Sequence, residues 1–83
     1  MTLAAKIDFG SKLKEIRECR KLTQRDLGIM CGFTEKTADV RIVQYEKNRK
    51  IPGPDVIEKM EKALGIKINI NVEIIDYTDY YCI

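Results

Sequence analysis

The 83-residue sequence contains no histidine, which removes the commonest metal ligand and the usual catalytic general base. A cysteine nucleophile would therefore lack its histidine partner, and the sequence has neither a metal-ligand cluster nor a glycine-rich phosphate loop. The three cysteines, Cys19, Cys31 and Cys82, are an odd number without metal-ligand spacing, which indicates reduced thiols. We therefore expect no enzymatic activity, no bound metal and no cofactor.

Long hydrophobic runs are also missing from the sequence. No apolar stretch approaches the ~20 residues that a membrane-spanning helix needs, and the first residues lack the pattern of a signal peptide. The hydrophobic content of 45% and the charged content of 34% are typical of a chain that folds in water. These features predict a cytoplasmic protein with no membrane partner and no evident small-molecule ligand.

The excess of positive charge is small, at +2 for the whole chain, but it is unevenly distributed. Residues 1–65 contain 14 Lys and Arg against 10 Asp and Glu, a net +4, whereas residues 66–83 contain one Lys against three acidic residues, a net −2. Within residues 36–50, five cations face two anions. This distribution fits nucleic-acid binding, although a run of charge is more often only a solvated surface.

Apolar residues recur with the period of an α-helix in the first 65 residues, which predicts four main helices. The first covers about 9–21, the second about 24–31 behind an N-cap at Thr23, the third includes Ala38 to Tyr45, and the fourth runs from Pro54 to Leu64. The second and third, joined through Gly32, form a helix-turn-helix whose second helix can enter a DNA major groove.

Gly28 stands in the middle of the second predicted helix, where glycine costs ~1 kcal/mol relative to alanine. Such a glycine indicates the close approach of another backbone. Asn48, which follows the third helix, is a natural residue for a left-handed cap.

After Gly65 the hydrophobic period changes from 3.6 to 2, which predicts one half-buried strand over residues 66–75. No Asn-Gly or Asp-Gly turn follows to fold this strand back, so it needs a partner for its backbone groups. The candidates are the first residues of the same chain or the same strand of a second chain, and we favour the second chain. The sequence thus divides into a helix-turn-helix domain at 1–65 and a C-terminal strand and tail at 66–83. The predicted dimer interface consists of Ile66, Ile68, Ile70, Val72 and Ile74.

A set of spaced residues within the helical part carries a family resemblance. The set comprises Leu22, Thr23, Gln24, Leu27, Gly28, Gly32, Phe33, Thr34, Ile42, Tyr45, Glu46, Pro52 and residues 62–65. Over about residues 9–66 the chain resembles the lambda-repressor-like, or XRE-type, helix-turn-helix family. The resemblance implies a mainly α helical bundle, here followed by a C-terminal β-strand. It also implies that Gln24 positions a DNA phosphate and that Glu46 is a structural partner of Arg17.

The sequence departs from the family pattern between Phe33 and Ile42, where it has four more residues than usual. Four residues are about one helical turn, so they either extend the third helix at its N-terminus or lengthen the turn, with Thr37 as the cap. We favour the extension. The choice affects the reading register, because counting from the turn selects Glu35 and Lys36, whereas counting back from Tyr45 and Glu46 selects Asp39 and Val40.

The candidate DNA contacts follow from the outward side of the third helix and the basic segment after it. Glutamine can bond adenine through two hydrogen bonds, lysine can donate to guanine, and valine can touch a thymine methyl group. The candidate base contacts are Lys36, Thr37, Val40 and Gln44. The candidate phosphate contacts are Gln24, Arg25, Lys47, Asn48, Arg49 and Lys50.

These features predict a sequence-specific transcriptional regulator that binds double-stranded DNA, most simply a homodimeric repressor. One helix-turn-helix reads only a half-site, so a homodimer on a pseudo-palindrome supplies the second reading helix. The alternative is a protein-interaction module, such as an antitoxin or anti-repressor, whose C-terminal strand adds to the sheet of a partner protein.

Overall fold

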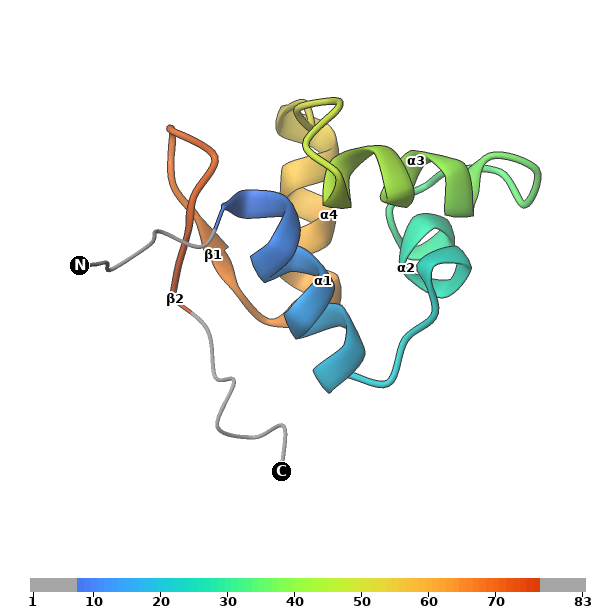
Figure 1. Ribbon diagram of the computed structural model, residues 1–83, viewed down its shortest axis with the longest axis horizontal. Coiled ribbons are helices and arrows are strands. Elements are labelled where there is room, and N and C mark those ends of the chain that lie inside the picture. Colours follow the sequence, from blue (N-terminus) through green and yellow to red (C-terminus); the bar gives the residue numbers. More distant parts are fainter. Residues whose placement is uncertain (1–7, 77–83) are drawn as a thin grey trace.

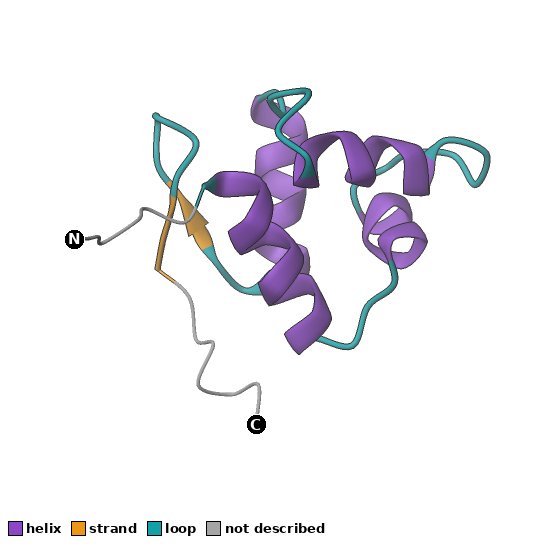
Figure 2. Ribbon diagram, in the orientation of Figure 1, coloured by secondary structure: helices purple, strands orange, loops and turns teal. Residues whose placement is uncertain are grey.

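The computed structural model describes residues 8–76, which form a helical body with a small two-stranded sheet at one end (Figures 1 and 2). The mainly α fold with a helix-turn-helix, predicted from the sequence, is confirmed. The elements are α1 (Phe9–Cys19), α2 (Gln24–Met30), α3 (Ala38–Glu46), α4 (Pro54–Leu64), β1 (Lys67–Ile68) and β2 (Ile74–Asp76).

Local capping sets both ends of α1. At its start the carboxylate of Asp8 accepts a hydrogen bond from the Ser11 backbone N–H at 2.7 Å, and this bond is the main reason that the pKa of Asp8 is lowered. The helix ends at Cys19, two residues before its predicted end. The cause is Lys21, which adopts a left-handed φ of 62° and lets the Leu22 N–H close back onto the Arg17 carbonyl at 3.2 Å.

A reciprocal cap starts α2. The Asp26 N–H donates to the Thr23 hydroxyl at 2.9 Å, while the Thr23 N–H donates to the Asp26 carboxylate at 3.1 Å. The bond from the Thr23 N–H stabilises the ionised carboxylate and is the main reason that the pKa of Asp26 is lowered. The predicted N-cap at Thr23 is confirmed.

Two glycines allow α3 to lie close to α1 and α2. A Cβ placed on Gly28 would lie 2.6 Å from the Cβ of Ala38, and one placed on Gly10 would lie 2.8 Å from the carbonyl oxygen of Tyr45. Real side chains do not tolerate such distances, so both positions require glycine. The close approach predicted at Gly28 is confirmed.

The core lies where the four helices meet, and Cys31 is part of it. Burial raises the pKa of the Cys31 thiol to about 11. Cys31 is a free thiol, whereas Cys19 is disulfide-bonded, so the expectation of reduced thiols is wrong for Cys19. The buried cluster consists of Leu13, Ile16, Leu27, Cys31, Ile42, Tyr45, Met60, Leu64 and Ile66.

The single strand predicted over residues 66–75 is wrong, because the chain reverses within it. β1 and β2 pair antiparallel, with Ile68 opposite Ile74. The reversal is held by the side chain of Asn69, whose Oδ1 accepts from the N–H groups of Asn71 at 2.9 Å and Glu73 at 3.0 Å. Val72 completes the turn in a left-handed conformation, with φ at 58°.

The predicted dimer interface assumed a strand with no pairing partner in its own chain, but the hairpin provides that partner. Ile66 belongs to the buried cluster, and Ile68 and Ile74 pack against it, so these three side chains are used within the chain. Val72 is half-buried, whereas Ile70 at the tip of the hairpin is 95% exposed. The other predicted partner, the first residues of the chain, lies outside the described residues, and the domain boundary at residue 65 stays a prediction.

Within residues 8–76, no helix combines the length and the apolar character that crossing a membrane requires.

Candidate nucleic-acid interface

The segment between α2 and α3 is a turn that continues through Thr37, longer than the helical extension that we favoured would leave. The Thr34 carbonyl accepts from the N–H groups of Thr37 at 3.1 Å and Ala38 at 2.8 Å, so residues 34–37 close into a turn and α3 begins at Ala38. The expected N-terminal extension of the helix is therefore wrong, and the alternative, a longer turn with Thr37 at the cap position, holds. Figure 1 shows this turn projecting beyond the first residues of α3, at the end of the molecule away from the hairpin.

The side of α3 that faces away from the core carries two candidate base contacts. Ala38, Ile42 and Tyr45 are buried, whereas Val40 is 53% exposed and Gln44, one turn later, is half-buried. The other two candidates, Lys36 and Thr37, are exposed but belong to the turn, where the Thr37 hydroxyl lies 3.1 Å from the Thr34 hydroxyl.

A buried ion pair holds the end of α3 against α1. The Nε of Arg17 donates to the Glu46 carboxylate at 2.6 Å, and both side chains are less than a tenth exposed, at 8% and 4%. The Nη1 of Arg17 also donates to the Leu22 carbonyl at 2.8 Å. The structural role of Glu46 that the family resemblance implied is confirmed.

Two candidate phosphate contacts have bonds inside the molecule. The Nε2 of Gln24 donates to Glu46 at 3.1 Å, so α2 joins the same carboxylate as α1. Asn48 adopts a left-handed φ of 60°, as predicted, and its Oδ1 accepts from the Gly10 N–H at 3.0 Å. Asn48 thereby fastens the start of α1 to the end of α3, a role that the sequence did not suggest.

The remaining candidate phosphate contacts lie on the surface. Lys47, Arg49 and Lys50 are exposed in and after the last turn of α3, where the Arg49 N–H donates to the Gln44 carbonyl at 2.8 Å. Arg25, in the first turn of α2, is 2.6 Å from the carboxylate of Glu35 in the extra turn.

Arg41 takes a position that sequence reasoning missed. Its guanidinium carbon lies 5.5 Å from the centre of the Phe33 ring, which is the geometry of a cation–π contact. The Phe33 ring in turn lies 6.3 Å from the ring of Tyr45. Arg41 thus packs over the junction of the turn and α3. A basic residue one turn after Thr37 was visible in the sequence, but the aromatic ring beneath it depends on the course of the longer turn.

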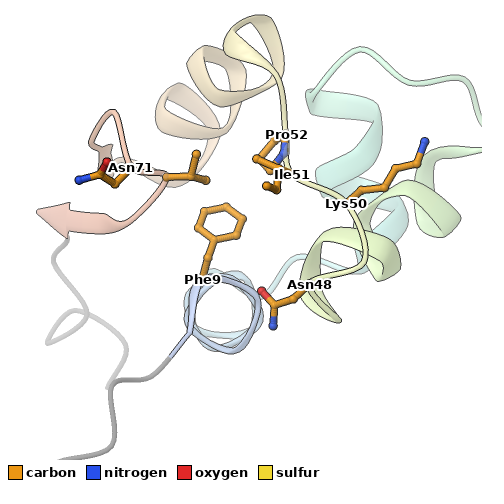
Figure 3. Close-up of a pocket in the computed structure, with 7 residues that line it drawn as sticks. Phe9, Asn48, Lys50, Ile51, Pro52 and Asn71 are labelled. Atoms are coloured by element: carbon orange, nitrogen blue, oxygen red, sulfur yellow. The ribbon is translucent and has the colours of Figure 1, made fainter.

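A mainly apolar groove of about 160 Å³ lies beside the end of α3, and two candidate phosphate contacts, Asn48 and Lys50, help to line it. Figure 3 shows Phe9 from the start of α1 pointing between the connector residues Ile51 and Pro52 and the hairpin turn at Asn71. The groove therefore lies between the connector after α3 and the turn of the hairpin.

Comparisons with known proteins agree with this geometry. A family model described as Helix-turn-helix matches residues 13–71. The chain is 34% identical over 64 residues to Multiprotein-bridging factor 1 of Saccharomyces cerevisiae, which covers 77% of this chain and 40% of that protein. It is 32% identical over 62 residues to Multiprotein-bridging factor 1 of Debaryomyces hansenii, with 75% and 39% covered. The human Endothelial differentiation-related factor 1 is 31% identical over 62 residues, with the same coverage.

The chain thus spans about two fifths of the length of these relatives. No solved structure matches it. The family match includes α2, the turn and α3, and it covers most of the chain. The chain belongs to the helix-turn-helix family of the lambda-repressor-like, XRE type, and this membership supports DNA binding.

Proposed function

We propose that this chain is a sequence-specific regulator of transcription that binds double-stranded DNA through α3 and the turn before it. The observation that carries the proposal is the outward side of α3, where Val40 leaves a large apolar side chain half in water within a helix-turn-helix. A major groove would cover that side chain, and the thymine methyl group is the natural contact for it. Both this function and its alternative below are non-enzymatic, and the cytoplasmic location stays a prediction.

The start of α3 at Ala38 supports one of the two reading registers. Recognition helices contact base edges with their N-terminal residues, and the first outward residues of α3 are Asp39 and Val40. We therefore place Val40 and Gln44 on bases from the helix. Lys36 and Thr37 contact bases from the turn.

The phosphate contacts fall into two groups under this proposal. Exposed positive charge comes before α3 in the chain from Arg25 and after it from Lys47, Arg49 and Lys50. The Gln24 amide gives one N–H to Glu46, and we assign its second N–H to a phosphate. The Asn48 backbone N–H already donates to the Tyr45 carbonyl at 3.1 Å, and its Oδ1 accepts from the Gly10 N–H. We therefore assign the side-chain amide N–H of Asn48 to a phosphate.

The test is affinity for two duplexes across salt concentrations, one selected from a random pool with the wild-type protein and one scrambled. We expect Val40→Ala and Gln44→Ala to reduce the preference for the selected duplex, because base contacts carry specificity. We expect Lys50→Gln to weaken binding to both duplexes alike and to reduce the salt slope by about one. Lys62→Gln on α4 makes the same charge change away from α3 and should alter neither. Equal binding of the wild-type protein to both duplexes would refute sequence-specific recognition.

The finer part of the proposal is a homodimer that represses from a pseudo-palindromic site. Because Ile66, Ile68 and Ile74 pack within the chain, we assign the contact to Ile70 at the hairpin tip and Ile51 beside the groove, which are 95% and 78% exposed. Light scattering should give twice the chain mass for the wild type and one chain mass for Ile70→Asp and Ile51→Asp. If the wild type is monomeric and still binds the selected duplex, the dimer proposal fails while the proposal of DNA recognition stands. A reporter gene placed after the selected site would show the sign of regulation.

A protein-interaction module is the second candidate function. The name of the yeast relatives, Multiprotein-bridging factor 1, describes those proteins as bridging others. In this chain the outer edge of the hairpin could add to the sheet of a partner, as the sequence suggested for the strand. Two results together would favour this candidate. A partner protein would bind the wild type but not variants changed in the hairpin, and selection from the random pool would recover no preferred duplex.

A further inference from the structure

We propose that Glu35 competes with DNA phosphates for Arg25 and thereby limits binding of this chain to DNA of any sequence. The inference rests on the proposed DNA-binding function and assigns a role to the extra turn. It starts from one contact, the 2.6 Å distance between the Nη2 of Arg25 and the Oε1 of Glu35, which joins the first turn of α2 to residues 34–37.

The chemistry of the pair makes the two partners of Arg25 alternatives. A carboxylate and a phosphate both present oxygens that match the fork of a guanidinium, so each satisfies Arg25 in the same way. With Glu35 in place, the positive charge of Arg25 is already balanced. A phosphate that approaches α2 then meets a neutral pair rather than a free cation.

The Arg25–Glu35 pair can open because both side chains are exposed to water. The side chains of Arg25 and Glu35 are 55% and 75% exposed, and exposed pairs are weak because water and salt screen them. DNA can therefore displace Glu35 at a small cost. The buried Arg17–Glu46 pair, at 8% and 4% exposure, offers no such exchange.

The consequence concerns affinity for DNA of any sequence. Phosphate contacts contribute equally on every sequence, so a carboxylate that weakens one of them lowers binding to selected and scrambled duplexes by the same factor. A negative charge near DNA also repels phosphates at long range without any competition. Asp39 provides that comparison, since it is exposed in the first turn of α3 and its Oδ1 accepts from the Val40 N–H at 2.8 Å.

The experiment measures dissociation constants for a scrambled duplex at several salt concentrations, with Glu35→Gln and Asp39→Asn each made in the wild type and in Arg25→Gln. We expect Glu35→Gln to tighten binding about twofold to fivefold more when Arg25 is present than when it is replaced, and to steepen the salt slope by about one. Asp39→Asn should tighten binding by the same factor in both backgrounds. Thermal unfolding confirms that each variant is folded.

The outcomes separate this inference from the proposed function. Equal gains from Glu35→Gln with and without Arg25 would show simple long-range repulsion and overturn the inference alone. Weaker binding by Glu35→Gln would also overturn it, because Glu35 would then orient Arg25 or contact a base. If neither the wild type nor any variant binds a duplex at low salt, the proposed function and the inference both fail.

Discussion

Arg17 on α1 and Glu46 at the end of α3 form an ion pair of 2.6 Å in which both side chains are buried. Gln24 at the start of α2 donates to the same carboxylate, so three helices converge on Glu46. The pair thereby fixes how α2 and α3 stand relative to α1, which is the arrangement that presents the outward side of α3.

Replacing Glu46 with alanine should lower the free energy of unfolding by about 3–5 kcal/mol, because the buried Arg17 charge keeps only the exposed Glu18 carboxylate, at 3.9 Å. Urea unfolding followed by circular dichroism measures the change. Glu58→Ala is the control, since Glu58 and Lys62 form an exposed pair at 4.0 Å whose loss should cost less than about 0.5 kcal/mol. Similar values for the two variants would contradict the role given to the buried pair.

Gly28→Ala should destabilise the protein by about 2–4 kcal/mol, because the new Cβ would lie 2.6 Å from the Cβ of Ala38 and force α2 away from α3. Gly53→Ala is the matched control. Nothing lies within 4 Å of a Cβ at Gly53, and its φ of −77° suits any residue, so its effect should stay within about 1 kcal/mol. Equal thermal shifts in the two variants would show that the helices separate without cost.

The parts of the fold that follow from local chemistry were predictable. The helical period marked four helices and Thr23 marked the start of α2, because both depend on neighbours within a few residues. Gly28 marked a close contact because glycine is unfavourable inside a helix unless another segment approaches it. The end of α1 was placed too late, because Lys21 adopts the left-handed conformation that the sequence would assign to glycine or asparagine.

The features that the sequence did not reveal depend on longer-range choices. The alternation of apolar residues continues on both sides of the hairpin turn, so a single strand and a hairpin give the same pattern. The turn itself relies on Asn69 and a left-handed Val72 instead of a glycine. Likewise, a helix lengthened by four residues keeps its apolar side facing the core, so the sequence pattern does not distinguish a longer helix from a longer turn. The structure shows a turn, in which the Thr34 carbonyl accepts from the N–H groups of Thr37 and Ala38.

The candidate site shows the same division. Val40 could be identified as outward-facing from the helical period alone. The contact of Arg25 with Glu35, and that of Arg41 with Phe33, join residues eight to ten positions apart across the longer turn. Their geometry depends on how that turn folds, which periodicity does not encode.

Stability should fall as the pH rises from 9 towards 11, in part through Cys31. Burial raises the pKa of this thiol from 9.0 to about 11, so above pH 9 the unfolded chain loses the proton more readily than the folded one. The contribution is fully present below pH 9 and is lost as the pH passes through the folded-state value. In Cys31→Ala the decline should be shallower, by up to about 1.4 kcal/mol per pH unit. Urea unfolding at each pH, relative to pH 8 for each variant, measures the difference, and parallel curves would contradict it.

The hairpin gives two isoleucines of one predicted strand opposite roles, and a matched pair of variants tests this. Ile74 packs against the core, so Ile74→Asp should lower the free energy of unfolding by about 2–3 kcal/mol through burial of a polar group. Ile70 is 95% exposed at the tip, so Ile70→Asp should change the stability of a dilute sample by less than about 0.5 kcal/mol. In an open strand the two residues would share one face and respond alike. Equal losses in urea unfolding would therefore restore the open strand and contradict the reversal at Asn69.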